Sequence, residues 1–162
     1  MKRLLIVFHT QFGGTAQMAH AALAGAQSAA AEASGVTVEL RRAADTGPAE
    51  VRAASGLVIA ASENFGGVAG AIKDFFERIY YPCEGELAGR PYARLICCGN
   101  DGAGAVRDLD RIAAGLKLAR VLPDVVYRSG LVATAHLLPA AVLAECADRG
   151  ATLAAGLDAG IY

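Results

Sequence analysis

The 162 residues fit one domain, residues 1–162, which at this size buries a core that needs neither disulfide nor metal. With 54% hydrophobic and 19% charged residues, the composition excludes a disordered or fibrous chain and favours a sheet covered on both faces. A formal net charge of −1, with no basic patch or polybasic stripe, argues against nucleic-acid or membrane-surface partners.

Two further sequence features concern location and redox state. The chain contains neither an apolar run long enough to span a membrane nor a signal-peptide cleavage pattern, so we expect a cytoplasmic protein. The four cysteines, at positions 83, 97, 98 and 146, have neither C-x-x-C spacing nor histidines at metal-ligand intervals. We therefore expect reduced, mostly buried thiols, and neither a zinc site nor a dithiol pair.

The first half of the chain predicts strands that alternate with helices. The apolar run at residues 4–8 predicts a strand that is buried on both faces, and the Ala-rich segment 15–33 predicts a helix. Residues 36–40 alternate apolar and polar side chains, as an edge strand does. A continuous apolar run at 57–61 predicts a second interior strand.

The second half repeats this unit. Residues 68–80 carry the strongest helical stripe in the chain, because their apolar side chains recur at three- and four-residue spacing. A strand is predicted at 93–98 and a helix with apolar positions from 106 to 116. The remaining strand material lies at 125–127 and 131–133, and the last helix opens at Pro139.

This alternation predicts an α/β fold with a single doubly wound, parallel, five-stranded sheet and helices on both faces. If the alternating second strand is an edge and the first and third are interior, the strand order is 2-1-3-4-5. Ligands bind such sheets beyond the carboxyl ends of the strands, where the winding direction reverses. The loops at residues 9–15 and 61–67 are therefore the candidate site.

The first loop, residues 10–15, has the features of a phosphate-binding turn. It leads from a buried strand into a helix and offers the hydroxyls of Thr10 and Thr15 and the unhindered backbone N–H groups of Gly13 and Gly14. It lacks the Lys of the G-x-x-x-x-G-K-[ST] loop, so it suits holding a phosphate rather than transferring one. The alternative is that Thr15 only caps the helix and the glycines only form the turn.

Two segments carry a family resemblance. The pattern T-x-[aromatic]-G-x-T at residues 10–15 resembles the loop with which the flavodoxin superfamily binds the phosphate of flavin mononucleotide (FMN). Phe12 departs from the Thr that is common in flavodoxins, toward the flavodoxin-like NAD(P)H:quinone reductases. Residues 61–75 resemble the second flavin loop, T-P-x-Y-[FN]-G-x-[hydrophobic]-x-G-x-[LI]-K, with Gly66, Gly70, Ile72 and Lys73 in register.

The second loop departs from that pattern at two positions. Ser62 replaces the usual Pro and Asn64 the usual Tyr, so the resemblance makes Phe65 the expected aromatic contact of the flavin ring. Glycines at 66 and 67 are expected to adopt positive φ and to bring the backbone to the ring edge. The alternative is an ordinary loop. A third loop, at residues 98–104, is placed to read the polar edge of the ring, although such glycine-rich turns are common in α/β proteins.

The resemblance runs from the first strand to the last helix and implies an FMN-binding oxidoreductase. In it, NAD(P)H reduces the flavin, which then reduces a quinone, a free flavin or a similar small molecule. The alternatives are a flavodoxin-type electron carrier that serves a redox-protein partner, and a flavin-free regulatory protein. The implied cofactor-binding residues are Thr10, Gln11, Phe12, Gly13, Gly14, Thr15, Ser62, Glu63, Asn64, Phe65, Gly66, Gly67, Gly99, Asn100, Asp101 and Gly102.

No side chain is assigned a catalytic or metal-binding role. A phosphate-accepting receiver domain is disfavoured, because the ends of the first and third strands lack acidic residues. The sequence leaves open the electron acceptor, the choice between NADH and NADPH, the effect of Ser62 and Asn64 on flavin affinity, and whether the chain forms a homo-oligomer.

Overall fold

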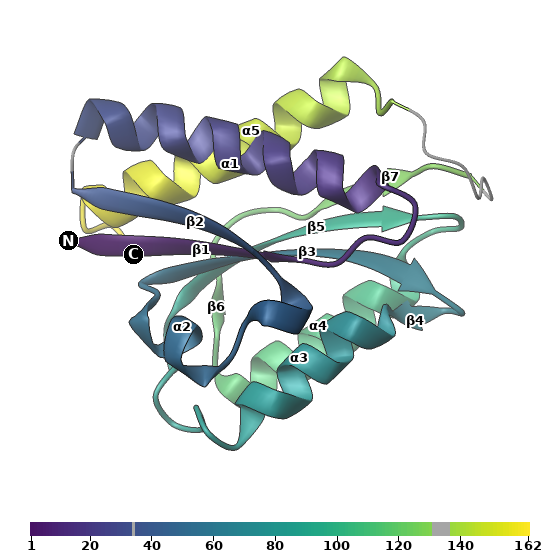
Figure 1. Ribbon diagram of the computed structural model, residues 1–162, viewed down its shortest axis with the longest axis horizontal. Helices are drawn as coiled ribbons and strands as arrows, with labels where there is room; N and C mark the ends of the chain where they lie inside the picture. The colour runs from purple at the N-terminus through teal and green to yellow at the C-terminus, as the bar shows by residue number, and fades with distance from the viewer. Residues whose placement is uncertain (34, 131–136) are drawn as a thin grey trace.

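A parallel sheet runs through the centre of the computed structural model, which describes residues 1–33, 35–130 and 137–162 (Figure 1). Its main strands lie in the order β2-β1-β3-β5-β6, as the sequence predicts for the first four positions. Two short strands lie off this path, because β4 pairs antiparallel with β3 and β7 pairs parallel with β5. The bounds are β1 Lys2–Phe8, β2 Val36–Arg42, β3 Gly56–Asn64, β4 Gly67–Val68, β5 Pro91–Cys98, β6 Ala119–Arg120 and β7 Val125–Arg128.

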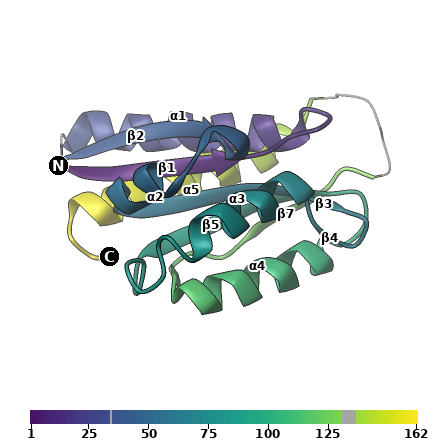
Figure 2. The same cartoon turned by 60° about the horizontal axis from the view of Figure 1, so that its bottom comes forward.

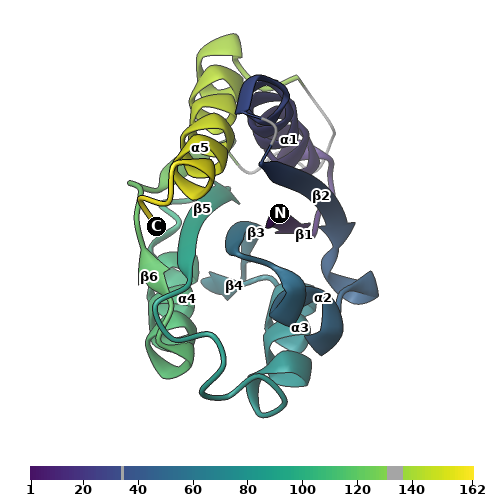
Figure 3. The ribbon, with the colours of Figure 1, turned by 90° about the vertical axis from the view of Figure 1, so that its left-hand side faces the viewer.

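Helices cover both faces of the sheet, which confirms the doubly wound architecture (Figure 3). α1 (Gly14–Ala33) and α5 (Ala140–Asp158) pack against each other on one face. The other face is covered by α2 (Pro48–Ala53), α3 (Gly70–Tyr80) and α4 (Ala103–Leu116), and a 3-10 turn, η1 (Ala43–Asp45), precedes α2. Within the described ranges, no helix is both long and apolar enough to cross a membrane.

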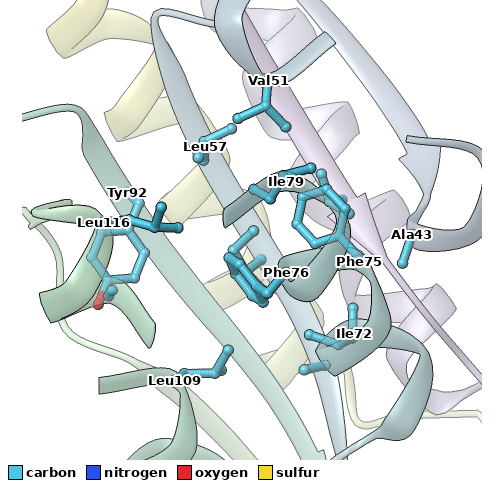
Figure 4. Packing of buried hydrophobic residues seen from close by; sticks show 14 of the residues in the cluster. Ala43, Val51, Leu57, Ile72, Phe75, Phe76, Ile79, Tyr92, Leu109 and Leu116 are labelled. Carbon is cyan, nitrogen blue, oxygen red and sulfur yellow. The ribbon is translucent and has the colours of Figure 1, made fainter. Parts of the chain in front are cut away.

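Each interior strand contributes side chains to two separate cores. Along β1, Leu4 and Ile6 belong to the core beneath α1 and α5, while Leu5 and Val7 belong to the core beneath α3 and α4. Alternate side chains of a strand point to opposite faces, so a strand buried on both sides is a continuous apolar run. Figure 4 shows the second core, in which the apolar stripe of α3 meets side chains of β3, β5 and α4.

The fifth position of the sheet differs from the prediction, because two short strands, β6 and β7, share it. Between them Pro123 has no N–H to donate, and Asp124 turns toward β5. There the Nε and Nη2 atoms of the fully buried Arg94 donate to the two carboxylate oxygens of Asp124, at 2.9 and 2.7 Å. A buried guanidinium requires such pairing, and its partner Asp124 lies in the segment that separates β6 from β7. The strand predicted at residues 131–133 lies outside the described residues.

The predicted start of the helix at residue 68 is also wrong. Val68 lies in β4, and α3 begins at Gly70. The cause is a β-hairpin in which Glu63 pairs with Val68 and Asn64 with Gly67. Val68 is apolar and in phase with the helical stripe, so periodicity alone extends the helix by two residues.

Candidate functional site

A cleft of about 580 Å³ lies beyond the carboxyl ends of β1, β3, β5 and β7. This volume is typical of small-molecule sites in proteins. The cleft lies at the edge of the sheet where β1 neighbours β3, which is the predicted switch point. It is lined by Thr10, Gln11, Phe12, Gly14, Thr15, Ser62, Glu63, Asn64, Phe65, Gly66, Cys97, Cys98, Gly99, Asn100, Ser129, Gly130 and Leu138.

All three loops singled out from the sequence therefore meet at one cleft. Four of the residues assigned to the cofactor do not line it and instead shape the loops. Gly13 adopts φ 92° in the first loop, and Gly67 is part of β4. In the third loop, the Asp101 carboxylate accepts the N–H of Ala103 at 3.0 Å, and Gly102 adopts φ 75° directly before α4.

The first loop presents backbone N–H groups that have no acceptor among the described residues. Thr10 Oγ1 accepts the N–H of Gly13 at 2.9 Å, which closes the turn. The first backbone hydrogen bond of α1 runs from the N–H of Gln17 to the carbonyl of Gly13, at 3.2 Å. The three N–H groups between these residues therefore have no acceptor within the helix. Together with the positive end of the helix dipole, they form a site for an anion.

Two contacts hold this loop against the rest of the cleft. Gly14 lies so close to β5 that a Cβ atom there would approach Cys97 Sγ to 2.8 Å, so a larger residue does not fit without movement. The side chain of Gln17 donates to the carbonyl of Gly13 at 3.4 Å and accepts the N–H of Leu138 at 3.0 Å. Leu138 thereby becomes part of the wall next to the anion site.

Sequence reasoning missed five lining residues: Cys97, Cys98, Ser129, Gly130 and Leu138. A usable signal was present for two of them. Ser129 and Gly130 follow the strand predicted at 125–127, and the carboxyl ends of parallel strands lie at the same edge of a sheet. Leu138 gives no such signal, because its place depends on the long-range hydrogen bond to Gln17.

Ser62 places an unpartnered oxygen at the cleft. Its Oγ is buried and forms no hydrogen bond with any of the described residues, although Ser62 lines the cleft. Ser62 pairs in register with Cys97 on the neighbouring strand, so the two side chains lie on the same face of the sheet. Buried hydroxyls are rarely left without a partner, so this oxygen is suited to a bound molecule.

The second loop forms a two-residue hairpin turn. Phe65 (φ 52°) and Gly66 (φ 71°) both have positive φ, the pattern of a type I′ turn. The prediction of positive φ is confirmed for Gly66 and wrong for Gly67, which stays extended because it pairs with Asn64 in the hairpin. Phe65 is fully exposed at the mouth of the cleft.

Comparison with known proteins defines the fold. No family model matches the sequence, and no curated protein matches it either. Solved structures do match: a flavodoxin from the domain Archaea has a TM-score of 0.75 at 16% identity, covering 94% of this chain and 96% of that chain. The chain has the flavodoxin-like fold.

Two further structures agree with this assignment. A WrbA-like flavodoxin from Agrobacterium tumefaciens has a TM-score of 0.73 at 15% identity, and the match covers 99% of this chain and 99% of that chain. The rubredoxin oxygen:oxidoreductase from Desulfovibrio gigas has a TM-score of 0.79 at 13% identity. Here the match covers 99% of this chain but 37% of the other, so the flavodoxin-like chain corresponds to one part of that protein.

The cleft of this flavodoxin-like chain is nearly uncharged. Among its described lining residues there is no Lys or Arg, and the one acid, Glu63, accepts the N–H groups of Gly104 and Ala105 at 2.8 and 3.1 Å. Burial raises the pKa of the Cys97 thiol, and burial with the nearby Glu63 charge raises the pKa of Cys98 to about 11. Both cysteines are therefore neutral thiols at physiological pH rather than nucleophilic thiolates.

His9, next to the first loop, is also neutral at physiological pH. Its pKa is lowered, first by burial and then by the positive charge of Arg42. The groups that the cleft offers to a ligand are therefore mainly backbone N–H groups, hydroxyls and apolar walls, because the carboxylate of Glu63 is already bonded to α4.

Proposed function

We propose that this chain binds FMN in the cleft and uses it to transfer electrons. The observation that carries the proposal is the uncharged first turn of α1. Its N–H groups have no acceptor among the described residues and lie at a cleft that is also lined by Ser62, whose buried Oγ has no partner among those residues. A phosphate monoester matches the first feature, and a polar group further along the same ligand matches the second.

The lining residues include groups suited to the phosphate, to the ring and to the part of the ligand between them. Thr10, Thr15 and the backbone N–H groups at the start of α1 would hold the phosphate. Ser62 would bind a polar atom between the phosphate and the ring. The walls for the ring come from the hairpin turn and the third loop, with Asn64, Phe65, Gly66, Gly99 and Asn100. The substitution of the usual Pro by Ser62 thus adds a hydrogen-bonding group.

Bound FMN supplies one- and two-electron chemistry, and the protein supplies position and environment. The apolar part of the wall would exclude water from the buried side of the ligand, and backbone groups of the hairpin turn, which lines the cleft, would influence its redox potential. Because both cysteine thiols are neutral, neither is activated as a nucleophile beside the bound cofactor.

We further propose NAD(P)H as the electron donor and a quinone, a free flavin or a similar small molecule as the acceptor. Phe12 in the first loop supports this choice, because it departs from the flavodoxin pattern toward the quinone reductases. The formal net charge of −1 also supports it, since it provides little electrostatic attraction for a basic protein partner.

The first test compares FMN with riboflavin, which has the same ring but lacks the phosphate. We expect isothermal titration of the purified protein to give at least a tenfold tighter Kd for FMN, which is about 1.4 kcal/mol. The Thr15→Ala variant should lose affinity for FMN and keep its affinity for riboflavin. Equal affinities for the two ligands, or no binding of FMN, would overturn the proposal.

The second test concerns the donor. FMN-loaded protein is mixed with NADH or NADPH without oxygen, and the absorbance of the oxidised flavin is followed. Bleaching within seconds to minutes is expected with at least one nucleotide. A flavin that stays yellow with both, but is bleached by dithionite, would overturn the NAD(P)H proposal and favour the electron carrier.

A further inference from the structure

The β3–β4 hairpin is fastened to the first turns of α4, which lies beside it (Figure 2). Glu63, at the base of the hairpin, accepts two N–H groups from the start of α4, as described above. In the opposite direction, the N–H of Val68 donates to the carboxylate of Asp108 at 2.9 Å. Arg107 Nη2 adds a bond to the carbonyl of Gly66 at 3.3 Å. Two acidic side chains and one basic side chain thus join the hairpin to α4, about forty residues apart in sequence.

The two segments also pack closely. A Cβ atom at Gly104 would lie 1.9 Å from the carbonyl oxygen of Gly66, so the hairpin rests on a position where only glycine fits. The Glu63 carboxylate is favoured there, because it meets free N–H groups at the positive end of the α4 dipole. The hairpin and α4 are therefore joined by both hydrogen bonds and close packing.

The turn of this hairpin is strained. Phe65 adopts φ 52°, a left-handed conformation that bulky side chains rarely take. Its fully exposed side chain makes no compensating core contact. Such a conformation persists where the surrounding structure holds it, and here the Glu63–α4 bonds lie directly beside the turn.

We propose that Glu63 is a positioning residue, which locks the Phe65–Gly66 turn onto α4 so that the ring-binding wall is formed before any ligand arrives. The proposal rests on the proposed function for its ligand and reassigns Glu63 from cofactor contact to support. A preformed wall raises affinity, because the turn does not have to be ordered during binding.

The experiment compares Glu63→Ala and Glu63→Gln with a control, Glu50→Ala. Glu50 has the same chemistry, since its carboxylate accepts the N–H of Gly47 at 2.8 Å at the start of α2, but it does not line the cleft. Glu63→Ala should weaken the binding of FMN and of riboflavin by the same factor, about tenfold. Glu63→Gln should restore most of the affinity, because its amide oxygen still accepts both N–H groups.

Unchanged affinities in Glu63→Ala, or an equal loss in Glu50→Ala, would overturn the proposal. A loss confined to FMN would also overturn it, because that would place the effect at the phosphate rather than at the ring wall.

A second measurement, on the ligand-free protein, separates this proposal from the proposed function. Amide hydrogen exchange by NMR should show faster exchange at Val68, Gly104 and Ala105 in Glu63→Ala than in wild type, because these N–H groups donate across the contact between the hairpin and α4, and no change there in Glu50→Ala. Protection equal to wild type would overturn the positioning role even if FMN binds. Failure of wild type to bind either flavin would overturn the proposed function, and the exchange data would still decide whether Glu63 holds the turn.

Discussion

Gly14, the first residue of α1, packs directly on Cys97 of β5, and a Cβ atom at Gly14 would lie 2.8 Å from the cysteine sulfur. This contact brings the N-terminus of the helix as close to the sheet as a glycine allows. The contact thereby sets the distance between β5 and the N–H groups at the start of α1. The proposed phosphate site thus depends on the absence of a side chain at position 14 of α1 and on the size of the side chain at position 97 of β5.

Gly14→Ala is therefore expected to destabilise the protein by about 1–3 kcal/mol, the usual range for overpacking. Combining it with Cys97→Ala should recover a large part of that loss, because the sulfur is the atom that clashes. Urea unfolding of the single and double variants measures the coupling. Gly70→Ala is the matched control, since a Cβ there meets none of the described atoms within 4 Å. A Gly14→Ala variant as stable as this control would contradict the contact.

Ser62→Ala should leave the stability of the ligand-free protein unchanged or raise it, and should lower the affinity for FMN. Without ligand the variant loses a buried hydroxyl that has no partner among the described residues, so stability should stay equal or rise by up to about 1 kcal/mol. FMN affinity should fall about fivefold to tenfold, because a hydrogen bond to the ligand is lost.

Thermal unfolding and FMN titration check both parts of this prediction. Ser129→Ala is the contrast, because the Ser129 hydroxyl already donates to the carbonyl of Cys98 at 3.2 Å and its removal should reduce stability. A stability loss of similar size in Ser62→Ala would show that Ser62 already has a partner in the protein.

Phe65→Asn should stabilise the ligand-free protein by about 1 kcal/mol. Asn tolerates the left-handed conformation, and Asn-Gly is the preferred pair for the type I′ turn that Phe65 and Gly66 form. Phe65→Ala, which removes the ring and retains a Cβ-bearing residue without this preference, should give little change. Chemical unfolding measures both variants, and equal effects would mean that the backbone conformation is not the source of the strain. Both variants should bind FMN more weakly, since the aromatic side chain is absent.

Stability should fall at alkaline pH because of Cys98. Burial and the charge of Glu63 raise the pKa of its thiol from 9.0 to about 11, so the folded protein holds this proton more tightly than the unfolded chain does. The stabilisation is complete below pH 9 and is lost as the pH rises toward 11. In Cys98→Ser the decline in unfolding free energy across this interval should be shallower than in wild type. Parallel pH profiles for the two proteins would contradict the assignment.

The fold could be predicted because its main signals are local. β1 and β3 are apolar on both faces and therefore stand out as interior strands, and the alternation in β2 marks it as the edge strand of the observed order. The division of the fifth strand was not predictable from local pattern, and the segment that divides it contains Asp124, whose partner Arg94 lies thirty residues away. The hairpin at residues 63–68 was missed for a different reason. Its turn places Phe65 at positive φ, a conformation that the propensity of a bulky residue does not predict.

The sequence by itself determined the order of the first four strands and the edge of the sheet at which to look for a site, because periodicity and turn chemistry are properties of neighbouring residues. It also identified the loops that meet there. Only the tertiary structure decided what individual residues do: that Glu63 bonds to α4, that Ser62 Oγ has no partner among the described residues, and that Leu138 forms part of the cleft wall. These roles arise from contacts between loops distant in the chain, and such contacts exist only once the parallel strands have brought their carboxyl ends together.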